Sequence, residues 1–237
     1  EQEEAIYFQL GGAEAAMPAG KTVIEYRLPK LETPDGERVL AENITLKIRG
    51  PEKICIVGPN GAGKTTLLNI IGLITDISEG TITIDSHKNL SMNGKNAMIL
   101  RRYTIGYLFQ NYGLIEDESV LWNLKLALEY KKVKKEEKLK LINKYLKQFE
   151  LSDMLNKKVY QLSGGEQQRI AIIKLILQGS QIILADEPTS GLDKENELIV
   201  MKLLKELNEK GITIIMVTHN MNLCDCFSRV INVENFR

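Results

Sequence analysis

Gly58-Pro59-Asn60-Gly61-Ala62-Gly63-Lys64-Thr65-Thr66 sets the architecture that we predict for this chain of 237 residues. The stretch follows the phosphate-loop pattern, in which a glycine and four further residues precede Gly-Lys-Ser/Thr. Its flanks agree with that pattern. The continuous apolar run 54–57 predicts a buried strand, and apolar residues at helical spacing over 67–71 predict a helix. Because a glycine-rich turn before a helix N-terminus presents free N–H groups, the sequence predicts a phosphate site.

Each side chain of this loop has an expected task. Lys64 is expected to reach the β- and γ-phosphates of a nucleotide, and the Thr65 hydroxyl to bind Mg²⁺. The glycines let the backbone approach the phosphates where a Cβ would block it. The predicted nucleotide-binding residues of the loop are Gly58, Asn60, Gly61, Gly63, Lys64, Thr65 and Thr66.

Two acidic residues follow a second apolar run, residues 182–185. Ligands of open parallel sheets bind at the carboxyl ends of the strands, so we expect Asp186 to lie beside the phosphate loop and to hold Mg²⁺ through water. Glu187 is then the candidate general base that polarises an attacking water. The alternative is a solvated acidic pair that caps the turn before Pro188.

A third pattern, Leu162 to Arg169, marks another helix start. Ser163 and Glu166 have the spacing of a capping box. The two glycines between them leave the amides of the first turn uncovered, which makes this helix terminus a second candidate anion site.

The rest of the chain predicts an α/β nucleotide-binding core that carries a helical insertion. Alternating or continuous apolar runs predict further strands over 23–28, 44–48, 81–85, 105–109 and 212–217, and helical spacing predicts helices over 119–130, 136–149, 163–177 and 194–209. Residues 86–102 are polar and give no clear prediction. The predicted organisation is an N-terminal arm over 1–20, a core over about 21–110 and 180–237 with a small antiparallel sheet, and a helical subdomain over about 111–179.

Composition excludes several classes of function. The 31 basic and 31 acidic residues balance, so no net charge attracts nucleic acid or anionic lipid. We find no apolar run of the roughly 20 residues that a membrane span needs and no basic leader, so we expect a soluble chain. Three cysteines, one of them within the predicted strand 54–57, indicate reduced thiols in a cytosolic protein, although Cys224 and Cys226 could also form part of a metal site.

Taken in order, these motifs resemble the ATPase domain of ATP-binding-cassette (ABC) proteins over nearly the whole chain. The resemblance implies a P-loop NTPase fold with a RecA-like core, ATP and Mg²⁺ as ligands, and two copies paired head to tail. It implies that the signature residues of one copy contact the nucleotide of the other. Those residues are Ser163, Gly164, Gly165 and Glu166. Asp193 would couple the two sites, Gln110 would touch Mg²⁺ or the attacking water, and His219 would hydrogen-bond the γ-phosphate.

One feature of the family is missing. ABC ATPases usually stack adenine on an aromatic side chain, but the matching position falls near Thr33-Pro34, and neither residue is aromatic. Tyr26 is the nearest aromatic candidate, with an ordinary place in a strand as its alternative. We therefore expect relaxed selectivity for the base.

Within the family, most motifs resemble transporter subunits. A glycine, Gly191, follows the serine of the stretch 186–193, where ribosome-acting ABC-F proteins usually carry Asn-His, and residues 107–118 resemble bacterial macrolide, lipoprotein and bacteriocin exporter ATPases. A membrane permease is then the expected partner, with the chain on the inner face of the cell membrane and no direct contact with nucleic acid. Residues Leu114, Ile115 and Trp122 could form the groove that accepts the permease, or could simply pack in the core.

The first 66 residues resemble ABC-F cassettes more closely than exporters. This difference suggests a chimera with a junction near 67–71. It also keeps open a second function, that of a ribosome-associated translation or antibiotic-resistance factor.

Overall fold

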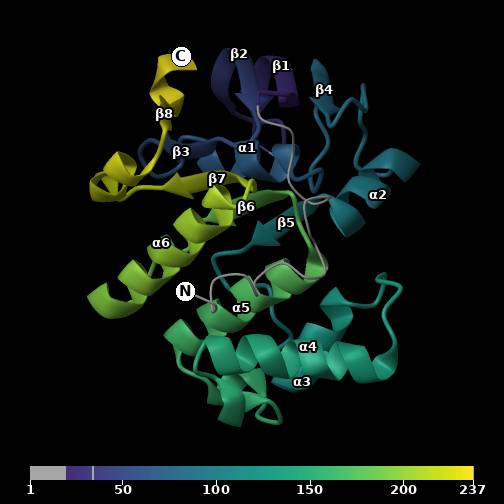
Figure 1. Cartoon of the computed structure of the whole chain (residues 1–237). Helices are drawn as coiled ribbons and strands as arrows, with labels where there is room; N and C mark the ends of the chain where they lie inside the picture. Colours follow the sequence, from purple (N-terminus) through teal and green to yellow (C-terminus); the bar gives the residue numbers. More distant parts are fainter. Residues whose placement is uncertain (1–19, 34, 237) are drawn as a thin grey trace.

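The computed structural model describes residues 20–33 and 35–236, and the helices and strands among them form two sheets surrounded by helices (Figure 1). Most of the predicted N-terminal arm therefore lies outside the described residues. The strands are β1 Thr22–Glu32, β2 Val39–Arg49, β3 Lys53–Val57, β4 Thr81–Ile84, β5 Ile105–Leu108, β6 Ile182–Asp186, β7 Thr213–Thr218 and β8 Arg229–Asn232. The α-helices are α1 Lys64–Ile71, α2 Lys95–Tyr103, α3 Val120–Ala127, α4 Lys135–Gln148, α5 Gly164–Gln178 and α6 Lys194–Glu209.

A five-stranded parallel sheet in the order β5-β6-β7-β3-β8 forms the centre of the molecule. The strands β3, β6 and β7 are buried along their whole length, which explains why their sequences are continuously apolar rather than alternating. All five strands end at the same edge, so the residues that follow β3 and β6 meet there. The parallel sheet confirms the predicted α/β class.

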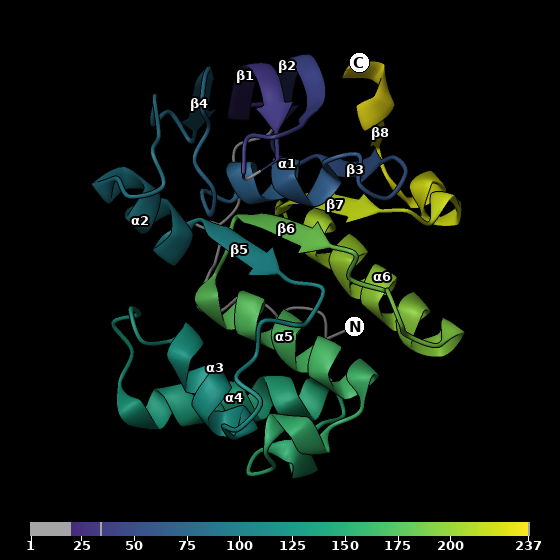
Figure 2. The ribbon, with the colours of Figure 1, turned by 180° about the vertical axis from the view of Figure 1, so that it is seen from behind.

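Alternate residues of the central strands belong to two different hydrophobic clusters. Ile54, Ile56 and Leu184 pack in one cluster with α1 and the antiparallel sheet, whereas Cys55 and Ile183 pack in the other with α3 to α6. Side chains of a strand point alternately to its two faces. The helices α1 and α5 therefore lie on opposite faces of the sheet, as both views of the ribbon show (Figures 1 and 2).

The smaller sheet, in the order β2-β1-β4, is antiparallel, as predicted. Tyr26 of β1 is fully buried in it, and burial raises the pKa of its hydroxyl well above the usual range. A side chain in this position cannot stack on a base. The interpretation of Tyr26 as an adenine-stacking residue is therefore wrong, and its alternative as a strand residue holds.

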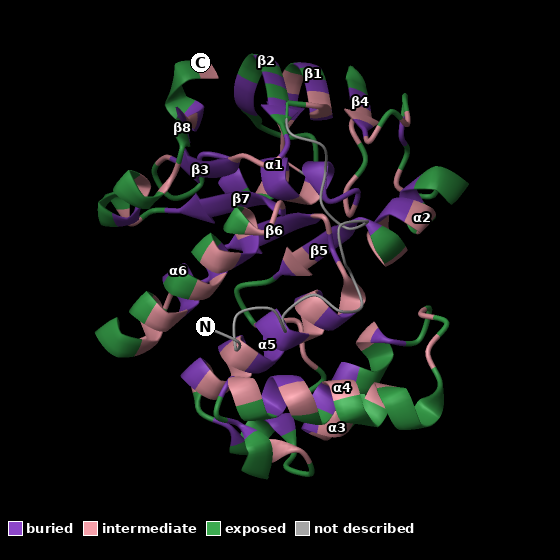
Figure 3. Cartoon of the chain, viewed as in Figure 1, coloured by how far each residue is buried: buried purple, intermediate pink, exposed green. Residues whose placement is uncertain are grey.

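The helices α3, α4 and α5 pack together on the far side of the parallel sheet, and the exposed residues of this group lie on α3 and α4, whereas α5 has none (Figure 3). The hydroxyl of Ser119 accepts a hydrogen bond from Trp122 N at the start of α3, and Gly179 ends α5 with a left-handed backbone. Among the described residues, no helix has both the length and the apolar character needed to cross a bilayer.

One α-helix and one strand of the described residues have no counterpart among the predicted elements. Helix α2 lies within the polar stretch 86–102 and beyond it by one residue, and only Ala97 and Leu100 of this helix are buried. Strand β8 has four residues and lies at the edge of the sheet, with one of them buried. Both elements bury too few side chains to leave a clear period in the sequence.

Candidate nucleotide site

The loop between β3 and α1 has the backbone of an anion site. Gly63 precedes the helix with φ of 90°, a conformation that favours glycine, and the first turn of α1 has neither a side-chain cap nor an acidic residue. In the described part of the chain, no acceptor is assigned to the N–H groups of residues 63–66. A Cβ at Gly58 would lie 2.5 Å from Val233 Cγ2, so this position also requires glycine. The loop thus presents free donors at the positive end of a helix dipole.

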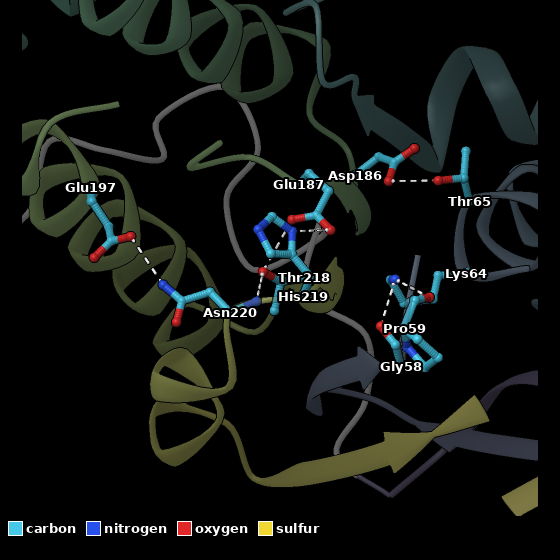
Figure 4. A network of polar contacts seen from close by, with 10 residues as sticks. All are labelled: Gly58, Pro59, Lys64, Thr65, Asp186, Glu187, Glu197, Thr218, His219 and Asn220. Carbon is cyan, nitrogen blue, oxygen red and sulfur yellow. Dashed lines mark hydrogen bonds and ion pairs between the residues drawn. The ribbon is translucent and has the colours of Figure 1, made fainter. Parts of the chain in front are cut away.

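The ammonium group of Lys64 lies over this loop. Its Nζ donates hydrogen bonds to the carbonyl oxygens of Gly58, at 2.7 Å, and Pro59, at 3.0 Å, and the residue is only 6 % exposed (Figure 4). A positive charge is thereby held beside the free N–H groups. This placement fits the expected contact of Lys64 with phosphate oxygens.

Thr65 and Asp186 meet across the two motifs. The Thr65 hydroxyl donates a hydrogen bond of 3.1 Å to Asp186 Oδ1, although the residues are 121 positions apart in sequence (Figure 4). Hydroxyl and carboxylate oxygens are ligands that Mg²⁺ accepts, and Mg²⁺ usually takes only one or two of them from the protein, with phosphate oxygens and waters completing its shell. The pair therefore fits a magnesium ion held jointly with a nucleotide.

Burial raises the pKa of Asp186, and repulsion by Glu187 adds to the effect, while the hydrogen bond from Thr65 and the charge of Lys64 oppose it. When folding raises the pKa of a carboxyl group, that group stabilises the folded protein at pH values below its pKa in the unfolded chain, which is near 3.8 for Asp. This stabilisation is lost as the pH rises through the pKa of the folded state. The ionised form of Asp186 is therefore less favourable to the folded state than its protonated form.

Asp186→Asn is accordingly expected to raise the melting temperature at pH 7 without nucleotide or Mg²⁺, because the amide removes a buried charge of unfavourable energy. The gain should shrink as the pH falls toward 4. Thermal unfolding at both values checks this, with Asp193→Asn as the control, since hydrogen bonds from Asn196 lower the pKa of Asp193. An unchanged or lower melting temperature of Asp186→Asn at pH 7 contradicts the prediction.

Glu187 is held by two neighbours at the end of β7. Its Oε1 lies 2.9 Å from His219 Nδ1, and its Oε2 accepts a hydrogen bond of 3.2 Å from the Thr218 hydroxyl (Figure 4). Its φ of 47° is rare for a residue other than glycine and is held by a hydrogen bond from Glu187 N to Val217 O. Strained backbones of this kind gather at functional sites. The side chain is thus fixed in one orientation.

This geometry gives His219 a different neighbour from the one expected. Nδ1 of His219 lies within hydrogen-bond distance of Glu187 Oε1, and which atom donates depends on the tautomer of the ring. The position of His219 therefore favours orientation of Glu187.

Most of the predicted site residues line one cavity of about 390 Å³, whereas Gly58 and Asp186 are not among its lining residues. Its lining includes the predicted residues Asn60, Gly61, Gly63, Lys64, Thr65, Thr66, Gln110, Glu187 and His219. Gln110 is exposed and follows β5, at the same edge of the sheet. Thr33 and Leu40 also line the cavity, and of these the sequence indicated only Thr33. Leu40 could not be found from the sequence, because it reads as an ordinary β-strand residue.

The signature residues form the predicted capping box at the start of α5. Glu166 N donates to the Ser163 hydroxyl at 3.3 Å, and Ser163 N donates to Glu166 Oε2 at 2.7 Å. The N–H groups of Gly164 and Gly165 have no assigned acceptor in the described part of the chain. None of residues 163–166 is among those that line the cavity, and α5 lies on the opposite face of the sheet from α1. One chain therefore does not bring its two anion sites together.

Asp193 lies at the start of α6, outside the residues that line the cavity. Its Oδ1 accepts a hydrogen bond of 2.8 Å from Asn196 N, and its Oδ2 accepts one of 2.8 Å from Asn196 Nδ2. Asp193 is therefore the N-cap of α6. The sequence analysis did not single out Asn196 or the contact of Thr218 with Glu187. Asparagine and threonine are common polar residues, so neither type indicates a functional role by itself.

A glycine-rich loop, a lysine and an acidic pair at the carboxyl edge of a parallel sheet define a nucleotide-binding protein of the phosphate-loop class. Comparison with known proteins makes the assignment narrower. A family model described as ABC transporter matches residues 41–190, so the chain belongs to the ABC transporter ATP-binding family.

Three known proteins illustrate the similarity. The chain is 38 % identical over 200 residues to the macrolide export ATP-binding/permease protein MacB of Campylobacter jejuni. The aligned region covers 84 % of this chain but only 31 % of MacB. It is 39 % identical over 201 residues to the uncharacterized ABC transporter ATP-binding protein MJ1508 of Methanocaldococcus jannaschii, covering 85 % of this chain and 90 % of that one. The chain also matches the dimeric post-hydrolysis structure of the ATP-binding cassette MJ0796 bound to ADP and Pi, with a TM-score of 0.79 and 36 % sequence identity. This match covers 88 % of the present chain and 93 % of the MJ0796 chain.

These matches confirm the resemblance to exporter-type ATPases and the ABC fold. They give no support to a chimera, because the family model extends across residues 67–71, where the junction was suspected. That segment lies within the buried helix α1. The alternative of a ribosome-associated ABC-F protein is not favoured either, since the relatives described above are transporter proteins and cassettes.

Proposed function

We propose that the chain binds and hydrolyses ATP as one half of a head-to-tail dimer that drives a membrane permease. One observation carries this proposal. The phosphate loop and Glu187 line one cavity, and Asp186 is hydrogen-bonded to Thr65 of that loop, while the free amides of Gly164 and Gly165 start a helix on the other face of the sheet. Only a second copy can bring those amides to the same triphosphate. The dimeric state of the MJ0796 cassette supports the same arrangement.

The proposed chemistry depends on charge neutralisation and positioning. Lys64 and the N–H groups of residues 63–66 bind the β- and γ-phosphates. Thr65 and Asp186 would hold Mg²⁺, which when bound offsets negative charge on the phosphate oxygens. Asn60, Gly61 and Thr66, which line the same cavity, complete the nucleotide contacts of the loop.

Glu187 orients the attacking water and accepts its proton, and His219 and Thr218 hold the Glu187 carboxylate for this step. Gln110 lines the same cavity from the end of β5 and is placed to contact the water or the metal. Ser163, Gly165 and Glu166 act on the nucleotide of the partner copy, and Asp193 links the two sites.

A permease is the proposed membrane partner, and it places the chain on the cytoplasmic face of the membrane. Ile115 and Trp122 are 45 % and 40 % exposed, so simple core packing does not account for them, whereas Leu114 is partly buried and packs against the core. Exposed apolar side chains of this size suit an interface with another protein. Export as the direction of transport rests on the likeness to MacB, a protein described as exporting macrolides.

Mixing two inactive variants tests the shared site. Lys64→Ala disables a phosphate loop, and Ser163→Phe blocks a signature helix at an exposed position. A mixed dimer then has one site with both defects and one intact site. At equal concentrations half of the dimers are mixed, so restored ATPase activity of about a quarter of the unmodified rate is expected from the symmetry of pairing.

The control is the mixture of each inactive variant with a second preparation of itself, which should remain inactive. A lack of restoration, in a mixture in which the mixed dimer is shown to form and to retain ATP, contradicts a site that is shared between two copies.

A further inference from the structure

Asn196, in the first turn of α6, contacts Asp193, Arg169 and Gly165, and the first and last of these are proposed to act on the partner copy. Its backbone N–H and its Nδ2 each donate to a different oxygen of Asp193, both at 2.8 Å. Its Oδ1 accepts a hydrogen bond of 3.0 Å from Arg169 of α5. The side-chain amide therefore uses its acceptor toward one helix and a donor toward the other.

The same amide lies against the backbone of Gly165. A Cβ at Gly165 would come within 2.3 Å of Asn196 Oδ1 and 2.4 Å of Asn196 Cγ. Real side chains do not tolerate such distances, so glycine at this position permits α6 to approach the first turn of α5. The contact fixes the distance between the free amides of α5 and the carboxylate of Asp193.

We propose that Asn196 is a positioning residue. It holds the start of α5, which carries the signature residues, and Asp193 as one rigid unit for docking on the partner copy. The inference rests on the proposed head-to-tail dimer. Gly165 and Asp193 come from different helices, and both are expected to reach the partner, so their relative position has to match its surface. An asparagine suits this task because its amide offers a donor and an acceptor on opposite sides.

Removal of the side chain by Asn196→Ala should leave the phosphate loop intact, since Asn196 does not line the cavity. We expect the affinity for ADP, measured on the monomer, to stay within about twofold. Dimerisation should be weakened instead. The loss of one charge-assisted hydrogen bond, together with its positioning effect, corresponds to a change of about tenfold in the dimerisation constant.

The experiment measures the ATP-dependent dimerisation constant by analytical ultracentrifugation in a Glu187→Gln background. The expected result is a dimer at least about tenfold weaker for Asn196→Ala. Asn196→Asp should be impaired at least as strongly, because it still accepts from Arg169 but sets a carboxylate against Asp193. Lys205→Ala, an exposed position two and a half turns further along α6, is the matched control and should pair normally.

Arg169→Lys tests the hydrogen bond between Arg169 and Asn196 from the side of α5. It is a second variant of the same contact, in case Asn196→Ala folds poorly. Combined with Asn196→Ala, it should add little to the defect, because two substitutions that break one contact are not additive. Normal pairing of Asn196→Ala, or fully additive defects in the double variant, overturns the inference. If the Glu187→Gln protein itself does not pair with ATP, the proposed function fails as well. If it pairs and Asn196→Ala pairs equally well, only the role of Asn196 fails.

Discussion

Glu187→Gln is expected to lower the steady-state rate of ATP hydrolysis by about 10²- to 10⁴-fold, the range in which general bases contribute. The glutamine has nearly the same shape and can keep a hydrogen bond with His219 or Thr218, but it cannot accept a proton from water. ATP should therefore still bind, and the dimer should accumulate with unhydrolysed nucleotide. Phosphate release and the elution volume on gel filtration measure these two effects.

His219→Ala provides the comparison for that experiment. It removes the neighbour at 2.9 Å from Oε1 but leaves the carboxylate and the hydrogen bond from Thr218. We expect a smaller loss of activity than for Glu187→Gln. A Glu187→Gln protein that hydrolyses ATP at the full rate contradicts the assignment of Glu187 as the base.

Lys64→Ala has the second largest expected effect, this time on nucleotide affinity. The ammonium group is nearly buried and lies beside the free N–H groups of the loop, so its removal takes away the principal positive side chain of the cavity. A hydrogen bond to a charged group contributes about 1.5–3 kcal/mol, which corresponds to a loss of roughly 10- to 100-fold in affinity. Titration calorimetry with ATP and Mg²⁺ measures this loss.

Lys88→Ala is a suitable control for that titration, because Lys88 is exposed and does not line the cavity. It should bind ATP as the unmodified chain does. Equal affinities of the Lys64→Ala and Lys88→Ala proteins would show that the triphosphate binds elsewhere.

The motifs that could be predicted from the sequence are those in which residue type and spacing have a single physical purpose. The phosphate loop needs glycines and a lysine at fixed positions, and Ser163 with Glu166 needs the spacing of a helix cap. Buried parallel strands such as β6 and β7 leave continuous apolar runs. Each of these patterns arises within a short segment, so it is visible without the fold.

Contacts between distant segments could not be predicted in the same way. That Asp186 lies beside the phosphate loop could be expected, because ligands of parallel sheets bind at the carboxyl ends of the strands. The contacts of Thr218 and His219 with Glu187 depend on how β6 and β7 pair. Asn196 reads as an ordinary polar residue of an exposed helix, and its neighbours become known only once α5 and α6 are packed. The domain limits and the catalytic roles remain predictions.

The parallel sheet separates two hydrophobic layers, and this separation limits how movement can pass through the molecule. The helices α3 to α5 pack in one layer and α1 packs in the other. We expect a displacement of α3 to α5 to pass around the rim of the sheet, where Lys174 of α5 donates a hydrogen bond of 2.8 Å to Gly113 O, three residues beyond Gln110. If the proposed function holds, the strands stay fixed while the segment after β5 transmits movement between the proposed membrane partner and the bound nucleotide.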